Sequence, residues 1–89
     1  MSATSPLDHI VEQRAPNLER FGAGAIHNTE NVVPISAKAN QAIADYYSTK
    51  QSFAGGMTVR EWLGTQSFAK QREFGQDILN RVLAGDPLP

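Results

Sequence analysis

The sequence predicts an all-α fold, a small three-helix domain preceded by a partly disordered N-terminal arm that carries one short helix. In the second half of the chain, apolar residues recur at intervals of three and four, and a good N-cap residue stands before each periodic stretch. The 89 residues suffice for one small domain and are too few for two. The three helices are expected over about 37–49, 59–66 and 68–84.

Local signals mark where each of these helices begins. Ser36 precedes the first helix, Thr58 the second and Ser67 the third, and Thr58 has the spacing to form a capping box with Glu61. Gly85 is expected to close the last helix in the left-handed conformation. The apolar residues at helical spacing are Ala39, Ala42, Ile43, Tyr46 and Tyr47 in the first helix, and Phe74, Ile78 and Val82 in the last.

The front of the chain differs in character, so we predict a division into an arm, residues 1–34, and a helical domain, residues 35–89. The arm holds three of the five prolines and has no long periodic pattern. A short helix is expected over about 6–14, because Pro6 suits a first helical position and Pro16 disfavours helix at the residue before it. Residues 31–35 form the plausible strand, with an extended lead-in to the first helix as an equal alternative.

Composition and charge exclude several classes of function. Eight Lys and Arg against nine Asp and Glu leave a net charge of −1, so no overall positive field gathers nucleic acid or an anionic membrane. The absence of Cys excludes disulfides, thiolate zinc sites and iron–sulfur clusters. No apolar run approaches the roughly 20 residues that cross a bilayer. We therefore expect no membrane partner and a location in the cytoplasm.

Catalysis and metal binding are not expected. The two histidines, His9 and His27, both lie in the arm, where a positioned general base is hard to build. Asp8, His9 and Glu12 would meet on one helical turn, but no second histidine stands at a metal-binding spacing. The sequence therefore predicts that the chain is not an enzyme and has no cofactor and no metal site.

A basic patch on the last two helices is an alternative to a solvated surface of mixed charge. Acidic residues alternate with the basic ones, whereas phosphate recognition requires charges of one sign to cluster, so the mixed surface is favoured. The basic residues are Arg60, Lys70, Arg72 and Arg81.

The size of the core favours a function in protein binding. Fifteen large apolar residues between Ile35 and Leu83, at roughly 1.5–3 kcal/mol each when buried, only narrowly offset the entropy of ordering the domain. We therefore predict a small regulatory or adaptor protein that binds another protein, or a second copy of itself, through amphipathic helices. The predicted contact residues are Leu7, Ile10 and Val11 on the arm, and Phe74, Ile78 and Val82 on the final helix.

A second hypothesis comes from the order of elements. The segment Asn31-Val32-Val33-Pro34-Ile35, followed by two capped helices, resembles the strand–helix–turn–helix order of ribbon-helix-helix proteins over about residues 30–67. The resemblance implies a dimer that inserts paired strands into the DNA major groove, and a role as a repressor or as the antitoxin of a toxin–antitoxin pair. The segment itself contains no Lys or Arg, so protein binding remains the first hypothesis.

Overall fold

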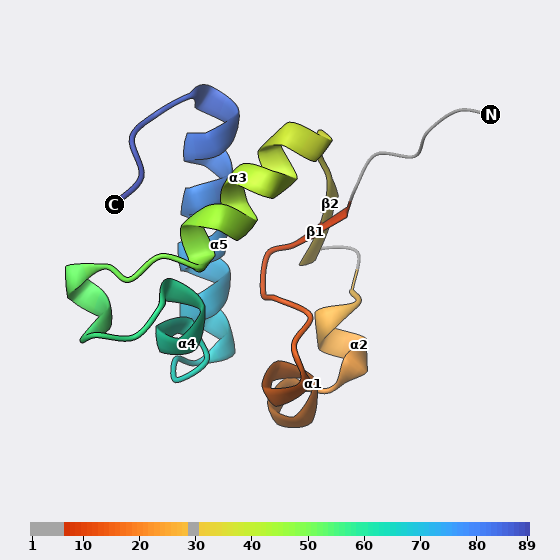
Figure 1. The fold of residues 1–89 in the computed structure, drawn as a ribbon. Helices are drawn as coiled ribbons and strands as arrows, with labels where there is room; N and C mark the ends of the chain where they lie inside the picture. The colour runs from red at the N-terminus through yellow and green to blue at the C-terminus, as the bar shows by residue number, and fades with distance from the viewer. Residues whose placement is uncertain (1–6, 29–30) are drawn as a thin grey trace.

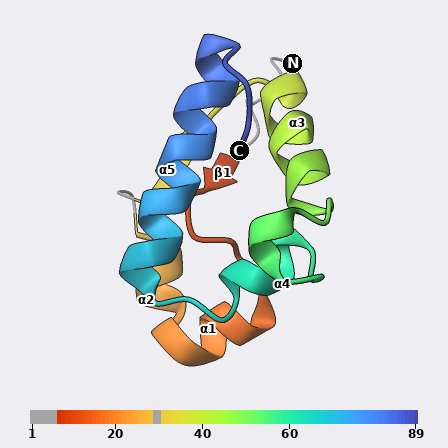
Figure 2. The ribbon, with the colours of Figure 1, turned by 90° about the vertical axis from the view of Figure 1, so that its left-hand side faces the viewer.

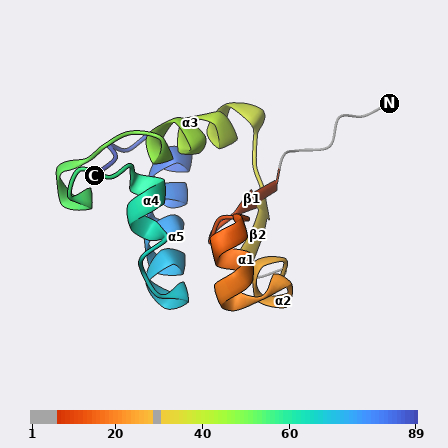
Figure 3. The same cartoon turned by 60° about the horizontal axis from the view of Figure 1, so that its bottom comes forward.

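A computed structural model describes residues 7–28 and 31–89 of the chain (Figure 1). The elements are β1 (Leu7–His9), α1 (Ala15–Phe21), α2 (Ala23–Ile26), β2 (Val32–Pro34), α3 (Ala37–Tyr47), the 3-10 turn η2 (Ser52–Ala54), α4 (Val59–Leu63) and α5 (Phe68–Ala84). Figure 3 shows that α3, α4 and α5 gather on one side, and that the two strands with α1 and α2 gather on the other. We call these the helical half and the front half.

The structure confirms that the chain is mostly helical, but it corrects the predicted all-α class. The described residues contain five α-helices rather than three domain helices and one arm helix, together with a small two-stranded sheet. The sheet joins β1 and β2 in antiparallel order, with Asp8 opposite Val33. Helices α1 and α2 and both strands lie in the predicted arm.

The three helices predicted for the second half of the chain are present and begin where they were expected. The Ser36 hydroxyl accepts a hydrogen bond from the Ala39 amide at 3.1 Å, and the Ser67 hydroxyl caps α5 in the same way. Thr58 and Glu61 form the complete capping box at the start of α4. Because these bonds join residues three positions apart, local sequence alone suffices to predict them.

The first two of these helices end earlier than predicted. Helix α3 stops at Tyr47 instead of residue 49, where the Thr49 hydroxyl donates to the Tyr46 carbonyl at 2.6 Å. Helix α4 stops at Leu63 instead of residue 66. There the Arg20 guanidinium donates to the Gly64 carbonyl at 2.6 Å, so a side chain of the front half satisfies the end of α4. A distant partner of this kind has no local sequence signal.

The predicted helix over residues 6–14 is wrong for its described part, since residue 6 lies outside the described residues. Residues 7–9 form β1, and the first helix among the described residues begins at Ala15. Pro16 lies in the first turn of α1, where its missing N–H costs no hydrogen bond, so it begins a helix instead of ending one. The local signals near Pro6 are overruled because the backbone of β1 gains hydrogen-bond partners in β2.

The predicted strand around residues 31–35 is confirmed as Val32–Pro34, and a buried asparagine beside it organises the front half. The Asn31 side chain accepts from the Val11 amide at 2.8 Å and donates to the carbonyls of Val11 and Ile26, at 3.1 and 2.8 Å. Its own carbonyl accepts from the Ile10 amide at 2.8 Å. One fully buried residue thus ties together the chain after β1, the end of α2 and the start of β2.

Close contacts join the front half to the helical half. The carbonyl of Ile10 lies against Gly75 of α5, where an added Cβ would overlap it. The buried Gln71 amide of α5 donates to the Asn17 side chain of α1 at 3.2 Å. The predicted division into a flexible arm, residues 1–34, and a helical domain, residues 35–89, stays a prediction.

A hydrophobic core cluster of buried residues lies mainly within the helical half. It joins the apolar faces of α3, α4 and α5, and Ile78 is completely buried within it. The front half adds buried side chains of its own at Ile10, Val11 and Ile26. The buried members of the helical cluster are Ile35, Ala39, Ile43, Tyr46, Tyr47, Val59, Leu63, Ile78 and Leu79.

Candidate functional site

The six predicted contact residues occupy different environments in the folded chain. Ile10, Val11 and Ile78 are 3%, 0% and 0% exposed, so they serve the interior of the chain itself. The backbone of Leu7 pairs with Pro34 in the sheet, and its side chain is outside the described part of the structure. Three of the six residues are thus covered without any partner.

The remaining two predicted residues, Phe74 and Val82, are partly buried against the core. The Phe74 ring lies 5.5 Å from the Trp62 ring and 5.8 Å from the Phe53 ring, measured between centroids, in a cluster of three aromatic rings. Val82 instead borders a groove on the surface. Val82 is therefore the predicted contact residue that the structure places at an accessible apolar site.

The groove beside Val82 is the candidate functional site. It lies between the N-terminal half of α3 and the C-terminal end of α5, and it has a volume of about 340 Å³. Figure 2 shows these two helices on opposite sides of the molecule in that view, with the end of α5 and the start of α3 at the same height. The groove, which we call the α3–α5 groove, is lined by Ser36, Lys38, Ala39, Ala42, Val82 and Leu83.

Apolar groups form most of this surface, and they differ in size. Leu83 is 59% exposed, and it is the more exposed of the two large apolar side chains that lie open among the described residues. On the opposite wall, Ala39 and Ala42 present only methyl groups. A projecting leucine beside small alanines leaves room for an apolar side chain or a helix from outside the chain.

One cation borders the α3–α5 groove. Lys38 lies on the first turn of α3 and forms no ion pair with any residue of the described ranges. Arg81, by contrast, pairs with Asp77 at 2.9 Å and donates to the Pro87 carbonyl. Lys38 therefore supplies the uncompensated charge at this site.

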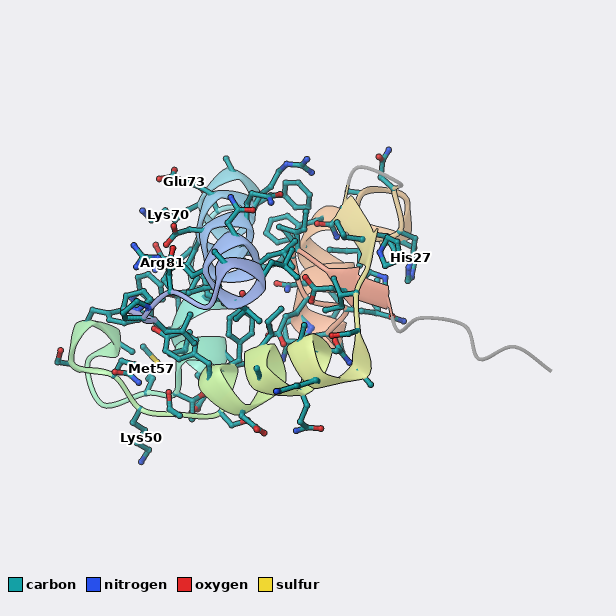
Figure 4. The ribbon with its side chains drawn as sticks, turned by 90° about the horizontal axis from the view of Figure 1, so that it is seen from above. His27, Lys50, Met57, Lys70, Glu73 and Arg81 are labelled. Atoms are coloured by element: carbon teal, nitrogen blue, oxygen red, sulfur yellow. The ribbon has the colours of Figure 1, made fainter. Side chains whose placement is uncertain are left out.

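The outer surface of α5 carries charges of both signs. Figure 4 shows Lys70, Glu73 and Arg81 on the same side of this helix, directed away from the interior. Arg60 is also engaged, because its Nε donates to both carboxylate oxygens of Glu12, at 3.1 and 3.0 Å. These contacts agree with the mixed-charge surface that the sequence favours.

The histidines meet each other rather than a metal-binding set. His9 Nε2 and His27 Nδ1 lie 3.3 Å apart across the front half. Burial, and the neighbouring His27, lower the pKa of His9. Within residues 7–28 and 31–89, no three His, Asp or Glu side chains are grouped to hold a metal ion. The absence of enzymatic activity and of a cofactor stays a prediction.

The sequence missed most of the α3–α5 groove. Leu83 stands next to the predicted Val82, but its exposure follows from the packing of α5 against α3, and the part played by Lys38 follows from the same packing.

Comparisons with known proteins found no match among protein families, curated proteins or solved structures. No helix in the described part of the chain combines the length and apolar character needed to cross a bilayer.

Proposed function

We propose that this chain is a non-enzymatic regulatory or adaptor protein that binds a helix of another protein in the α3–α5 groove. The observation that supports the proposal is Leu83, which projects 59% exposed beside a hollow of about 340 Å³. Large apolar side chains exposed beside a concave apolar surface are typical of sites that bind proteins.

Shape and charge together specify the partner. The alanines of α3 permit the close approach of a helix, and an apolar side chain of that helix fills the space between Ala42 and Leu83. Lys38 at the border favours a partner with a carboxylate beside its apolar face. The expected occupant is an amphipathic helix with an acidic flank.

The size of the site sets the strength of binding. Complete burial of a leucine contributes roughly 1.5–3 kcal/mol, and Leu83 is already partly covered. Covering Leu83 alone therefore cannot hold a partner, because association itself costs several kcal/mol. The partner helix must also contact Val82 and the alanines, and a weak, reversible complex is expected.

A selection with displayed peptides tests this proposal. A library of amphipathic helical peptides is selected on the full chain, and each binder is measured by fluorescence anisotropy. Leu83→Asp is expected to weaken binding by about tenfold or more, because it places a charge in the apolar groove. Ala84→Asp introduces the same charge one residue further on, outside the groove, and is the matched control.

Two results would contradict the proposal. One is that peptides selected on the chain bind Leu83→Asp as well as they bind the parent. The other is concentration-dependent dimerisation in sedimentation velocity that Leu83→Asp abolishes and Ala84→Asp does not. The second result would assign the groove to another copy of the chain and would replace the proposed partner.

The ribbon-helix-helix hypothesis remains the alternative function. In that family the strand pairs with the strand of a second copy, whereas β2 here pairs with β1 of the same chain along one edge. A gel-shift series with mixed duplex DNA at low salt tests the hypothesis. Binding that weakens steeply as salt increases would support DNA binding over the adaptor function.

A further inference from the structure

A second cavity, of about 170 Å³, lies between the front half and α3. Figure 2 shows β1 in the middle of the molecule, between α5 and α3. Its lining combines the carboxylates of Asp8 and Glu12 with the apolar side chains of Ile43 and Ala44 and the Tyr47 ring. We call it the Asp8 cavity.

The two carboxylates of this cavity differ in their partners. Glu12 is held by Arg60, whose Nε lies 3.0 Å from Oε2. Asp8 is only 8% exposed, yet its carboxylate receives no hydrogen bond and no ion pair from any described residue. A buried carboxylate without a partner is costly, so this arrangement points to a group that is supplied from outside.

Asp8 borders the cavity, and its carboxylate oxygens are not fully occluded. In the described part of the chain, no fully occluded side-chain oxygen or nitrogen lacks a hydrogen-bond partner. Because Asp8 lacks such a partner, its oxygens are not fully occluded, and Asp8 lines the cavity. A ligand within the cavity can therefore contact them directly.

No cation among the described residues forms an ion pair with Asp8. The Arg14 side chain also lines the cavity, but its Nη1 donates to the Arg60 carbonyl at 3.3 Å. Arg60 bonds Glu12 and, at 3.1 Å, the Ser48 hydroxyl. Burial and His27 lower the pKa of His9, so His9 adds no positive charge at neutral pH. None of these cations is paired with Asp8, so the Asp8 carboxylate is available to a ligand.

We propose that the Asp8 cavity binds an alkylammonium group, with the Asp8 carboxylate as its counter-ion. The Asn40 side chain, which also lines the cavity, offers an amide oxygen as a further acceptor. Ile43, Ala44 and the Tyr47 ring provide apolar surface for the methylene groups that carry the ammonium. This inference does not depend on the α3–α5 groove.

The chemistry of the cavity favours an ammonium over other cations. A metal ion needs several ligands, and no suitable group of three is present among the described residues. An ammonium is a compact charge that one carboxylate and one neutral acceptor can satisfy. Tyr47 adds no negative charge, because burial raises the pKa of its hydroxyl well above the ordinary value.

A titration followed by NMR tests the inference. n-Butylammonium chloride is added to the full chain, and amide shifts are expected at Asp8, Asn40 and Ala44. Asp8→Asn is expected to weaken binding by roughly tenfold or more, since it removes the counter-ion. Asp45→Asn removes an exposed carboxyl of the same helix that lies outside the cavity, and it should leave binding unchanged.

A control ligand and a second variant complete the test. 1-Butanol, which has the same chain without the charge, is expected not to bind. If Asp8→Asn fails to fold, Ala44→Leu, which fills the cavity from α3, is expected to block butylammonium. Equal binding of butanol and butylammonium, unchanged binding by both variants, or no shifts on titration would each overturn the proposal.

One arm distinguishes the source of the ammonium. Nα-acetyl-lysine methylamide carries the same alkylammonium on a peptide unit. If it shifts the same amides as butylammonium does, the cavity accepts the lysine of another protein. Binding of butylammonium alone would assign the cavity to a free small amine, and either result supports the shared chemistry.

Discussion

At the scale of single residues, Gly75 and Asp8 are constrained most by their surroundings. Gly75 lies in the middle of α5, a position where glycine normally weakens a helix, and it is buried because the backbone of Ile10 crosses there. Asp8 is a buried carboxylate that forms no ion pair with any described residue. Close approach of the backbone explains the first residue, and the proposed ligand explains the second.

Replacing Gly75 with Ala is expected to destabilise the chain by about 1–3 kcal/mol or more, because the new methyl group overlaps the Ile10 carbonyl and neither backbone can move freely. Urea unfolding measures the change. Gly24→Ala in α2 is the control, since a Cβ there meets nothing within 4 Å, and a gain of about 0.5–1 kcal/mol is expected. Equal stability of the Gly75 variant and the parent would show that the two halves do not pack as described.

Asp8 gives a prediction for pH. Burial, with the nearby Glu12 charge, raises the pKa of Asp8 from its ordinary value of 3.8. The folded chain therefore keeps this proton to a higher pH than the unfolded chain, and the free energy of unfolding that Asp8 contributes decreases as pH rises through that window. The stability of Asp8→Asn relative to the parent should increase over the same window, as measured by urea unfolding at several pH values. A pH-independent difference would contradict the burial of an uncompensated carboxyl.

At the scale of elements, α4 shows how a helix of five residues is held in place. A helix this short is not stable alone, because nucleation is costly. The capping box of Thr58 and Glu61 satisfies its beginning, and the Arg20 guanidinium donates to the Gly64 carbonyl just after its end. Residues close in sequence thus supply the hydrogen bonds at the start of α4, and the front half supplies the one at its end.

The capping box makes a separate prediction. Thr58→Ala removes the hydroxyl that accepts from the Glu61 amide at 3.1 Å, so a loss of about 1 kcal/mol is expected. Thermal unfolding followed by circular dichroism measures it. Ser52→Ala, in the neighbouring η2 turn where no side-chain cap bond forms, is the control. A loss equal to that of the control would mean that α4 depends on packing rather than on its cap.

At the scale of the whole molecule, the front half supplies buried apolar side chains that complete the fold. The sequence indicates that residues 35–89 alone barely outweigh the entropy of folding. The chain itself buries Ile10, Val11 and Ile26. Part of the apolar surface that we expected a partner to cover is therefore covered within the chain. The accessible apolar surface is correspondingly smaller and is concentrated around Leu83.

Two substitutions on α5 separate folding from binding. Ile78→Asp places a charge at a completely buried position and is expected to abolish cooperative unfolding. Leu83→Asp lies at the surface and should leave the melting curve close to that of the parent while it weakens peptide binding. Circular dichroism melts of both variants make the comparison. A cooperative, parent-like melt of Ile78→Asp would show that Ile78 does not lie in the core.

The candidate site could be predicted from the sequence only in part. Helical spacing predicted Val82 as a contact residue, because residues four apart on a helix share a face. The α3–α5 groove also needs Lys38 and Ala42, which come from a helix about forty residues earlier in the chain. Spacing along one helix cannot show which second helix will lie beside it.

What the sequence determined by itself was the position of the helix starts at Ser36, Thr58 and Ser67, since capping acts over three residues. Only the tertiary structure decided that residues 7–9 form a strand, through pairing with residues 32–34. It also decided that Asp8 is enclosed and that Leu83 is open to solvent. Burial and strand pairing depend on residues far away in the chain, which local free energies of helix formation do not sense.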